Sequence, residues 1–133
     1  MKIITRNQLK FAGVLILLSV AYQYGLNIIH NYNELRFVLA FQFFYFGSIF
    51  FFVWLFGRKE NVSISIVDLS FKYHIITYAI CNSIAELWFH YNLQSNCENI
   101  SYVHLGGLYW GLGLLVHFFL FNIFSKNMEL GFE

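Results

Sequence analysis

Polar side chains recur at every fourth position in one otherwise apolar segment of the chain. They are His74, Tyr78, Asn82, Glu86 and His90. On an α-helix, residues four apart differ by about 40° around the axis, so these five form one slowly winding stripe. A shorter stripe of the same kind lies in the first apolar segment and consists of Ser19, Gln23, Asn27 and His30. We expect both stripes to face the interior of a helix bundle.

The simplest role for these stripes is structural, because polar groups in a membrane are costly unless they find partners. Hydrogen bonds between membrane helices contribute about 0.6 kcal/mol each, so a stripe can hold neighbouring helices together. A second role is a proton or ion path with Glu86 as its titratable centre. One carboxylate without a matching basic residue in another segment gives that path little support. The structural role is therefore preferred.

Histidine ligation of a metal or haem is a third role. Around a turn near Asn96, His90 lies at the depth of His104, and His74 lies at the depth of His117. His74 and His90 differ by about 160° around their expected helix, and His104 and His117 differ by about 140° around theirs. This rotation argues against two stacked haems. A single bis-histidine site, formed by His74 and His117, is the arrangement for metal or haem that remains possible. No cofactor is predicted.

Glycines in the last apolar segment indicate close helix packing. Gly106, Trp110, Gly113 and His117 follow a 4-3-4 spacing, which is typical of a seam between two helices. Gly107 and Gly111 add a Gly-x-x-x-Gly pair. Glycines allow two backbones to approach closely, within one chain or between copies. The sequence therefore predicts a packing face on this helix.

The composition of the chain indicates that these helices lie in a membrane. Only 11% of the 133 residues are charged, 59% are hydrophobic, and there is no proline. Soluble domains carry about 25% charged residues, so this chain is poorly suited to water. Four segments, at about 9–29, 37–56, 71–91 and 102–124, have the length of roughly 20 predominantly apolar residues that crosses a bilayer. We expect an all-α integral membrane four-helix bundle of two antiparallel transmembrane hairpins, residues 1–60 and 61–133.

Lysine and arginine are distributed unevenly between the two expected sides of the membrane. Seven lie on the side of the amino terminus and only Arg36 lies on the other: the seven are Lys2, Arg6, Lys10, Arg58, Lys59, Lys72 and Lys126. The positive-inside rule then places both termini in the cytoplasm. A cleaved signal peptide ending near Ala21 is the alternative for the first helix, but the apolar run continues to Ile29.

Several functional classes are disfavoured. A net charge of +1 implies no general attraction to nucleic acid. Cys81 and Cys97 lie at different expected depths and suggest no disulfide framework. No nucleophile motif, phosphate-binding loop or carboxylate pair is present, so we expect a protein that is not an enzyme.

Residues 69–126 resemble the bacterial two-transmembrane (2TM) domain family. The sequence Phe71-x-x-His74-x-x-x-Tyr78-x-x-x-Asn82 is similar to that family's opening helix, and Trp110-Gly111-Leu112-Gly113-Leu114-x-x-His117 to its most specific signature. Family members usually carry a tryptophan-proline element before this signature, where this chain has Leu105-Gly106-Gly107. The resemblance implies a bacterial inner-membrane protein and a sensory or regulatory module. It implies no reaction.

The preferred function is therefore a multi-pass membrane protein that acts through helix–helix contacts, as a sensory, regulatory or scaffold module. Its expected partners are the lipid bilayer and a second copy or another membrane protein. Two alternatives stay open: a transporter or channel subunit that uses the polar stripe with Glu86, and a cofactor binder through His74 and His117.

Overall fold

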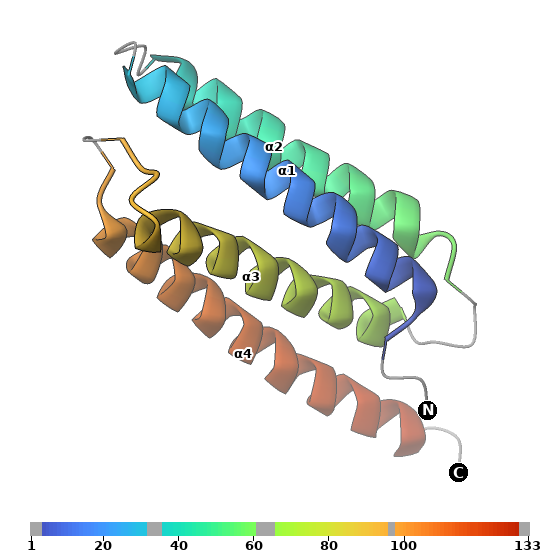
Figure 1. The fold of residues 1–133 in the computed structure, drawn as a ribbon. Helices are drawn as coiled ribbons and strands as arrows, with labels where there is room; N and C mark the ends of the chain where they lie inside the picture. Colours follow the sequence, from blue (N-terminus) through green and yellow to red (C-terminus); the bar gives the residue numbers. More distant parts are fainter. Residues whose placement is uncertain (1–3, 32–35, 61–65, 96–97, 131–133) are drawn as a thin grey trace.

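The computed structural model describes residues 4–31, 36–60, 66–95 and 98–130. The described residues form four helices and no strand: α1 Arg6–Asn31, α2 Arg36–Gly57, α3 Ile66–His90 and α4 Ile100–Leu130 (Figure 1). The predicted all-α fold is confirmed. All four helices are longer than the expected segments, and Cys97 lies outside the described residues.

Local capping explains where α1 begins. The Thr5 hydroxyl accepts a hydrogen bond from the backbone N–H of Gln8 at 3.2 Å, and the Gln8 side-chain oxygen accepts one from the backbone N–H of Thr5 at 3.0 Å. This reciprocal pair is a capping box, which satisfies two backbone donors that the first turn leaves without partners.

A left-handed residue explains where α3 ends. Asn92 has a φ of 53°, a conformation that asparagine tolerates better than most residues. The backbone N–H of Leu93 donates to the carbonyl of Trp88, and that of Asn92 to the carbonyl of Phe89. These two bonds form a Schellman motif, which stops the helix and turns the chain toward α4.

The helices are arranged as an open stack. α1 contacts both α2 and α3, α2 contacts α3 over a small area, and α4 contacts α3 alone. The starts of α1 and α3 and the ends of α2 and α4 lie at one end of the molecule (Figure 1). We call this the basic end, after Arg6, Lys10, Arg58 and Lys59, and the opposite end, with His30, Leu93 and Glu98, the far end.

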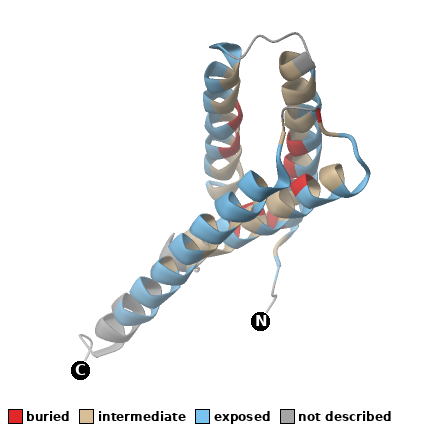
Figure 2. Ribbon diagram, turned by 90° about the vertical axis from the view of Figure 1, so that its left-hand side faces the viewer, coloured by how far each residue is buried: buried red, intermediate tan, exposed pale blue. Residues whose placement is uncertain are grey.

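The core lies where α1, α2 and α3 meet. Its buried members are Phe11, Leu15, Tyr45, Ile49 and Tyr73. Phe11 and Tyr73 are 0% and 1% exposed, with ring centroids 5.0 Å apart in an edge-on arrangement. α4 contributes no buried residue in its described part (Figure 2). One helix of the four is therefore held by a single neighbour.

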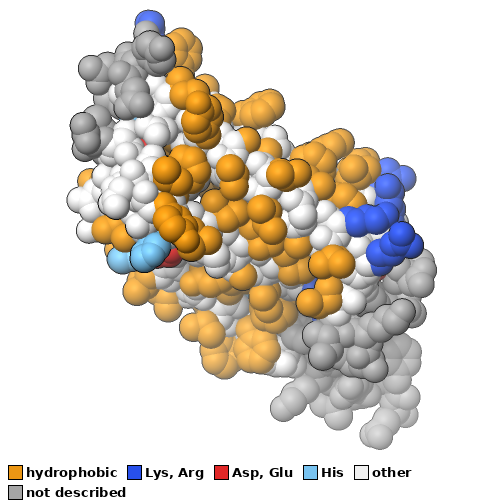
Figure 3. Space-filling model, in the orientation of Figure 1, with side chains coloured by type: hydrophobic (Ala, Val, Ile, Leu, Met, Phe, Trp, Pro, Cys, Tyr) orange, Lys and Arg blue, Asp and Glu red, His pale blue; other side chains and the backbone are white. Residues whose placement is uncertain are grey.

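Three helices, α1, α2 and α4, are long and apolar enough to cross a membrane. α3 is not among them, although a crossing by the segment 71–91 was expected. Its 25 residues span about 37 Å at 1.5 Å per residue, so composition rather than length is what it lacks. Figure 3 shows hydrophobic side chains over the middle of the visible face, with Lys and Arg gathered mainly at one end.

Candidate functional site

The polar stripe of α3 lies largely against α4. The rings of His74 and His117 have centroids 5.2 Å apart at 69°. One turn further along, Tyr78 meets Trp110 edge-on, with centroids 5.8 Å apart. A Cβ added to Gly107 would lie 2.7 Å from the Asn82 side-chain oxygen, so that asparagine sits directly over the α4 backbone. The stripe and α4 thus form a continuous ladder of contacts.

Two glycines make this ladder possible and two do not take part in it. Gly107 faces Asn82, and a Cβ added to Gly111 would lie 3.1 Å from the Tyr78 hydroxyl. A Cβ added to Gly106 or Gly113 would meet nothing within 4 Å. The expected seam of Gly106, Trp110, Gly113 and His117 is therefore divided. Trp110 and His117 face α3, whereas the other two lie on the open face of α4.

Glu86 lies at the far-end side of the ladder and pairs with His104. The Glu86 carboxylate is 2.9 Å from the His104 ring nitrogen. The two side chains are 47% and 59% exposed, so Glu86 is not in the bundle interior. The expected depth match of His90 with His104 is not what the structure shows: His90 is exposed and its ring contacts Tyr91. Glu86, one turn before His90, lies opposite His104, whereas His74 lies opposite His117 as expected.

The stripe of α1 contacts its neighbours at two depths. In the middle, the Ser19 hydroxyl is 2.8 Å from the Tyr45 hydroxyl, which is 3.2 Å from the Cys81 sulfur. This cluster joins α1, α2 and α3. At the far end, the Asn27 amide donates to the carbonyl of Leu93 at 2.8 Å. Sequence reasoning did not identify Tyr45 or Cys81 as members, since both lie in apolar runs and their meeting depends on helix rotation.

Among the described residues, the stripe and α4 bring together two pairs of potential metal ligands, His74 with His117 and Glu86 with His104. Structural zinc sites usually have four protein ligands, and catalytic sites usually have three. Within the part of the chain that the structure describes, no group of three His, Cys, Asp or Glu residues is placed to hold a metal ion. The His74 and His117 rings contact one another, and the His117 ring also contacts that of Phe71, with centroids 5.6 Å apart. This geometry is that of a packed aromatic cluster.

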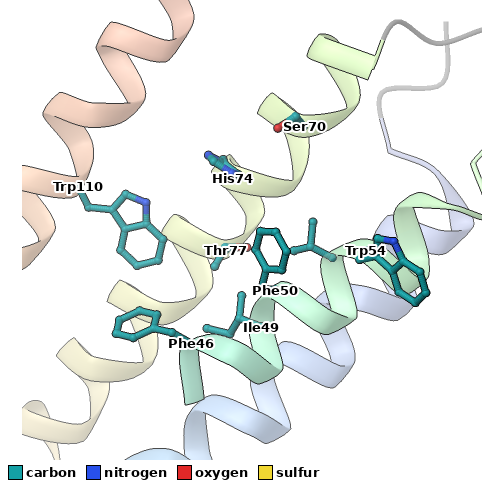
Figure 4. A pocket seen from close by; sticks show the side chains of 9 residues that line it. Phe46, Ile49, Phe50, Trp54, Ser70, His74, Thr77 and Trp110 are labelled. Atoms are coloured by element: carbon teal, nitrogen blue, oxygen red, sulfur yellow. The ribbon is translucent and has the colours of Figure 1, made fainter. Parts of the chain in front are cut away.

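A groove runs over α3 between α2 and α4. Its volume is about 620 Å³, and Figure 4 shows α2 on one side and Trp110 of α4 on the other. The lining is mostly apolar: Phe46, Ile49, Phe50, Val53, Trp54, Ser70, His74, Thr77 and Trp110. The Thr77 hydroxyl donates to the carbonyl of Tyr73 within its own helix at 2.8 Å. The groove stays open because, among the described residues, α4 contacts no helix other than α3.

A second cavity, of about 400 Å³, lies at the far end between α1, the end of α3 and the start of α4. It combines three aromatic rings with polar groups: Tyr22, Gln23, Leu26, His30, Phe89, Glu98, Asn99, Tyr102 and Val103. Gln23 and His30 belong to the α1 stripe, but sequence reasoning did not predict the cavity. Glu98 lies in the connection between α3 and α4, and the periodic spacing of polar residues on a helix does not predict how a connection folds.

Comparison with models of known protein families, with curated proteins and with solved structures gave no match. The resemblance of residues 69–126 to the 2TM domain family therefore stays a prediction. The functional interpretation below depends on the geometry of this chain.

Proposed function

We propose that this chain is a non-enzymatic membrane protein that assembles with a second copy of itself through helix–helix contacts. In this proposal it forms two antiparallel transmembrane hairpins, residues 1–60 and 61–133. The observation that carries the proposal is the single-sided packing of α4, which contacts α3 and leaves the rest of its apolar surface uncovered. Assembly of this kind suits a sensory, regulatory or scaffold module.

The proposal includes a crossing by α3, despite its polar residues. Tyr78 and Asn82 lie half-buried against α4, and the His74 ring contacts that of His117 at the edge of the groove. Glu86 has His104 as its partner. Polar groups in membrane helices are tolerated where they face other helices and are paired. The far-end connection then lies on the opposite side of the membrane from the basic end.

Charge supports an orientation with the basic end in the cytoplasm of a bacterial cell. Arg6, Lys10, Arg58 and Lys59 lie at that end, and Arg36 lies at the other. Arg58 lies over the Trp54 ring at 4.7 Å, an arrangement suited to the interface between lipid and water. Both termini are cytoplasmic in this orientation.

A second copy is the occupant that the exposed face of α4 favours. Gly106 and Gly113 are seven residues apart, which places them close to one line along the helix. A Cβ at either position would enter open space, so a partner backbone can approach there. Two copies related by a two-fold axis would each present this face and the adjoining groove, so every contact is made twice.

Dilution of labelled protein in lipid vesicles tests this proposal. Energy transfer between copies should report dimers in the wild type, and Gly106→Leu and Gly113→Leu should each weaken the dimer about tenfold or more, equivalent to roughly 1.4 kcal/mol. Gly13→Leu is the matched control, because that glycine of α1 also faces open space. A wild type that stays monomeric at every protein-to-lipid ratio would contradict the proposal, as would equal effects of all three substitutions.

A further inference from the structure

The far-end cavity has walls that suit a positively charged molecule. Three of its lining residues are aromatic: Tyr22 from α1, Phe89 from α3 and Tyr102 from α4. The faces of aromatic rings attract cations through their quadrupoles. Tyr22 also stacks on Tyr45 of α2, with centroids 3.9 Å apart, and Tyr102 is 74% exposed. The same cavity holds one carboxylate, that of Glu98. Aromatic rings together with a carboxylate form a common recognition pattern for ammonium groups.

The Glu98 carboxylate is held in place from two sides. The Ser95 hydroxyl donates to it at 3.1 Å, and the His30 ring nitrogen lies 3.1 Å away. The side chain is only 10% exposed, so a charge here is poorly screened by solvent. Its described partners are a neutral hydroxyl and an imidazole, neither of which carries a permanent positive charge. The α4 helix begins two residues later, at Ile100.

The volume and the lining of the cavity restrict the class of ligand further. A volume of about 400 Å³ lies in the range of small-molecule sites. A bare metal ion would need several further ligands, and the described residues contain no group of three suitable side chains. An anion would meet the Glu98 carboxylate. We propose that this cavity binds a small organic cation, an ammonium with an apolar substituent, with Glu98 as the counter-ion and the rings as walls.

Titration calorimetry with benzyltrimethylammonium, on the full chain in a neutral detergent, tests this site. Benzyl alcohol serves as the neutral control ligand and benzenesulfonate as the anionic one. We expect saturable binding of the cation only. Glu98→Gln should weaken that binding at least tenfold, and Tyr102→Leu should weaken it severalfold, because each removes one element of recognition. Glu86→Gln is the matched control, since Glu86 is also paired with a histidine but does not line the cavity.

Three results would overturn the inference. The first is no binding of the cation to the wild type up to about 10 mM, a concentration at which even weak ligands bind. The others are equal binding of benzyl alcohol and unchanged binding of the cation by a folded Glu98→Gln. The comparison of ligands needs no variant, so it decides the matter even if a substitution impairs folding. The site is independent of the proposed dimer. Gly113→Leu, three turns along α4 from Tyr102, should bind the cation as the wild type does, so failure of one proposal is distinguishable from failure of the other.

Discussion

Gly107→Leu and Gly111→Leu are each expected to separate α4 from α3. Both glycines lie under α3 side chains, with Asn82 over the first and the Tyr78 hydroxyl over the second. Larger side chains forced into a close contact typically cost about 1–3 kcal/mol. The loss should be large for α4 because it has no other helix to hold it. Thermal unfolding in detergent should show a lower midpoint or an early transition for both variants.

Gly106→Leu and Gly113→Leu are the internal controls for this prediction. They introduce the same side chain on the same helix, but into open space. Leucine also favours the helical state over glycine by up to about 1 kcal/mol. These variants should unfold at or above the wild-type midpoint, although they weaken the proposed dimer. Equal destabilisation by Gly106→Leu and Gly107→Leu would mean that α4 is rotated differently about its axis.

Tyr73→Ala is expected to be the most damaging single change in the core. Tyr73 is 1% exposed, packs edge-on against Phe11, and directs its hydroxyl toward Glu60 at 3.4 Å. Removing the ring leaves a cavity on the order of 100 Å³, which at roughly 24 cal/mol per Å³ costs about 2 kcal/mol. The cost in lipid comes from lost packing, since lipid is as apolar as the core.

Tyr73→Phe separates packing from hydrogen bonding at this position. It keeps the ring and removes only the long contact with Glu60, so its loss of stability should stay below about 1 kcal/mol. Chemical unfolding of the two variants in the same detergent gives both free energies. A loss for Tyr73→Phe as large as that for Tyr73→Ala would show that the hydroxyl, and not the ring, stabilises this end.

Helix geometry explains which parts of the ladder could be predicted from the sequence. Residues spaced by four share a face whatever surrounds the helix, so His74, Tyr78 and Asn82 were grouped together from spacing alone. The rotation of α4 about its axis depends instead on side-chain packing with α3. This is why the sequence did not distinguish Gly107, which faces Asn82, from Gly106, which borders open space.

The pairing of the histidines and the far-end cavity also could not be predicted from the spacing of residues. Matching depths around a turn depends on where α3 stops, and the left-handed Asn92 decides that stop. The structure pairs His104 with Glu86, one turn before His90, while His74 still contacts His117. The far-end cavity depends on Glu98, whose place follows from its contacts with Ser95 and His30 rather than from any periodic pattern.

The position of Leu93 relative to the membrane tests most directly whether α3 crosses it, and with it the four-span arrangement. Leu93→Cys and Lys59→Cys, each made with Cys81→Ser and Cys97→Ser, can be labelled with an impermeant maleimide in cells and in inverted vesicles. We predict labelling of the two positions from opposite faces of the membrane, since α3 lies between them. Labelling of both from the same face would contradict the four-span arrangement and leave α3 on the membrane surface.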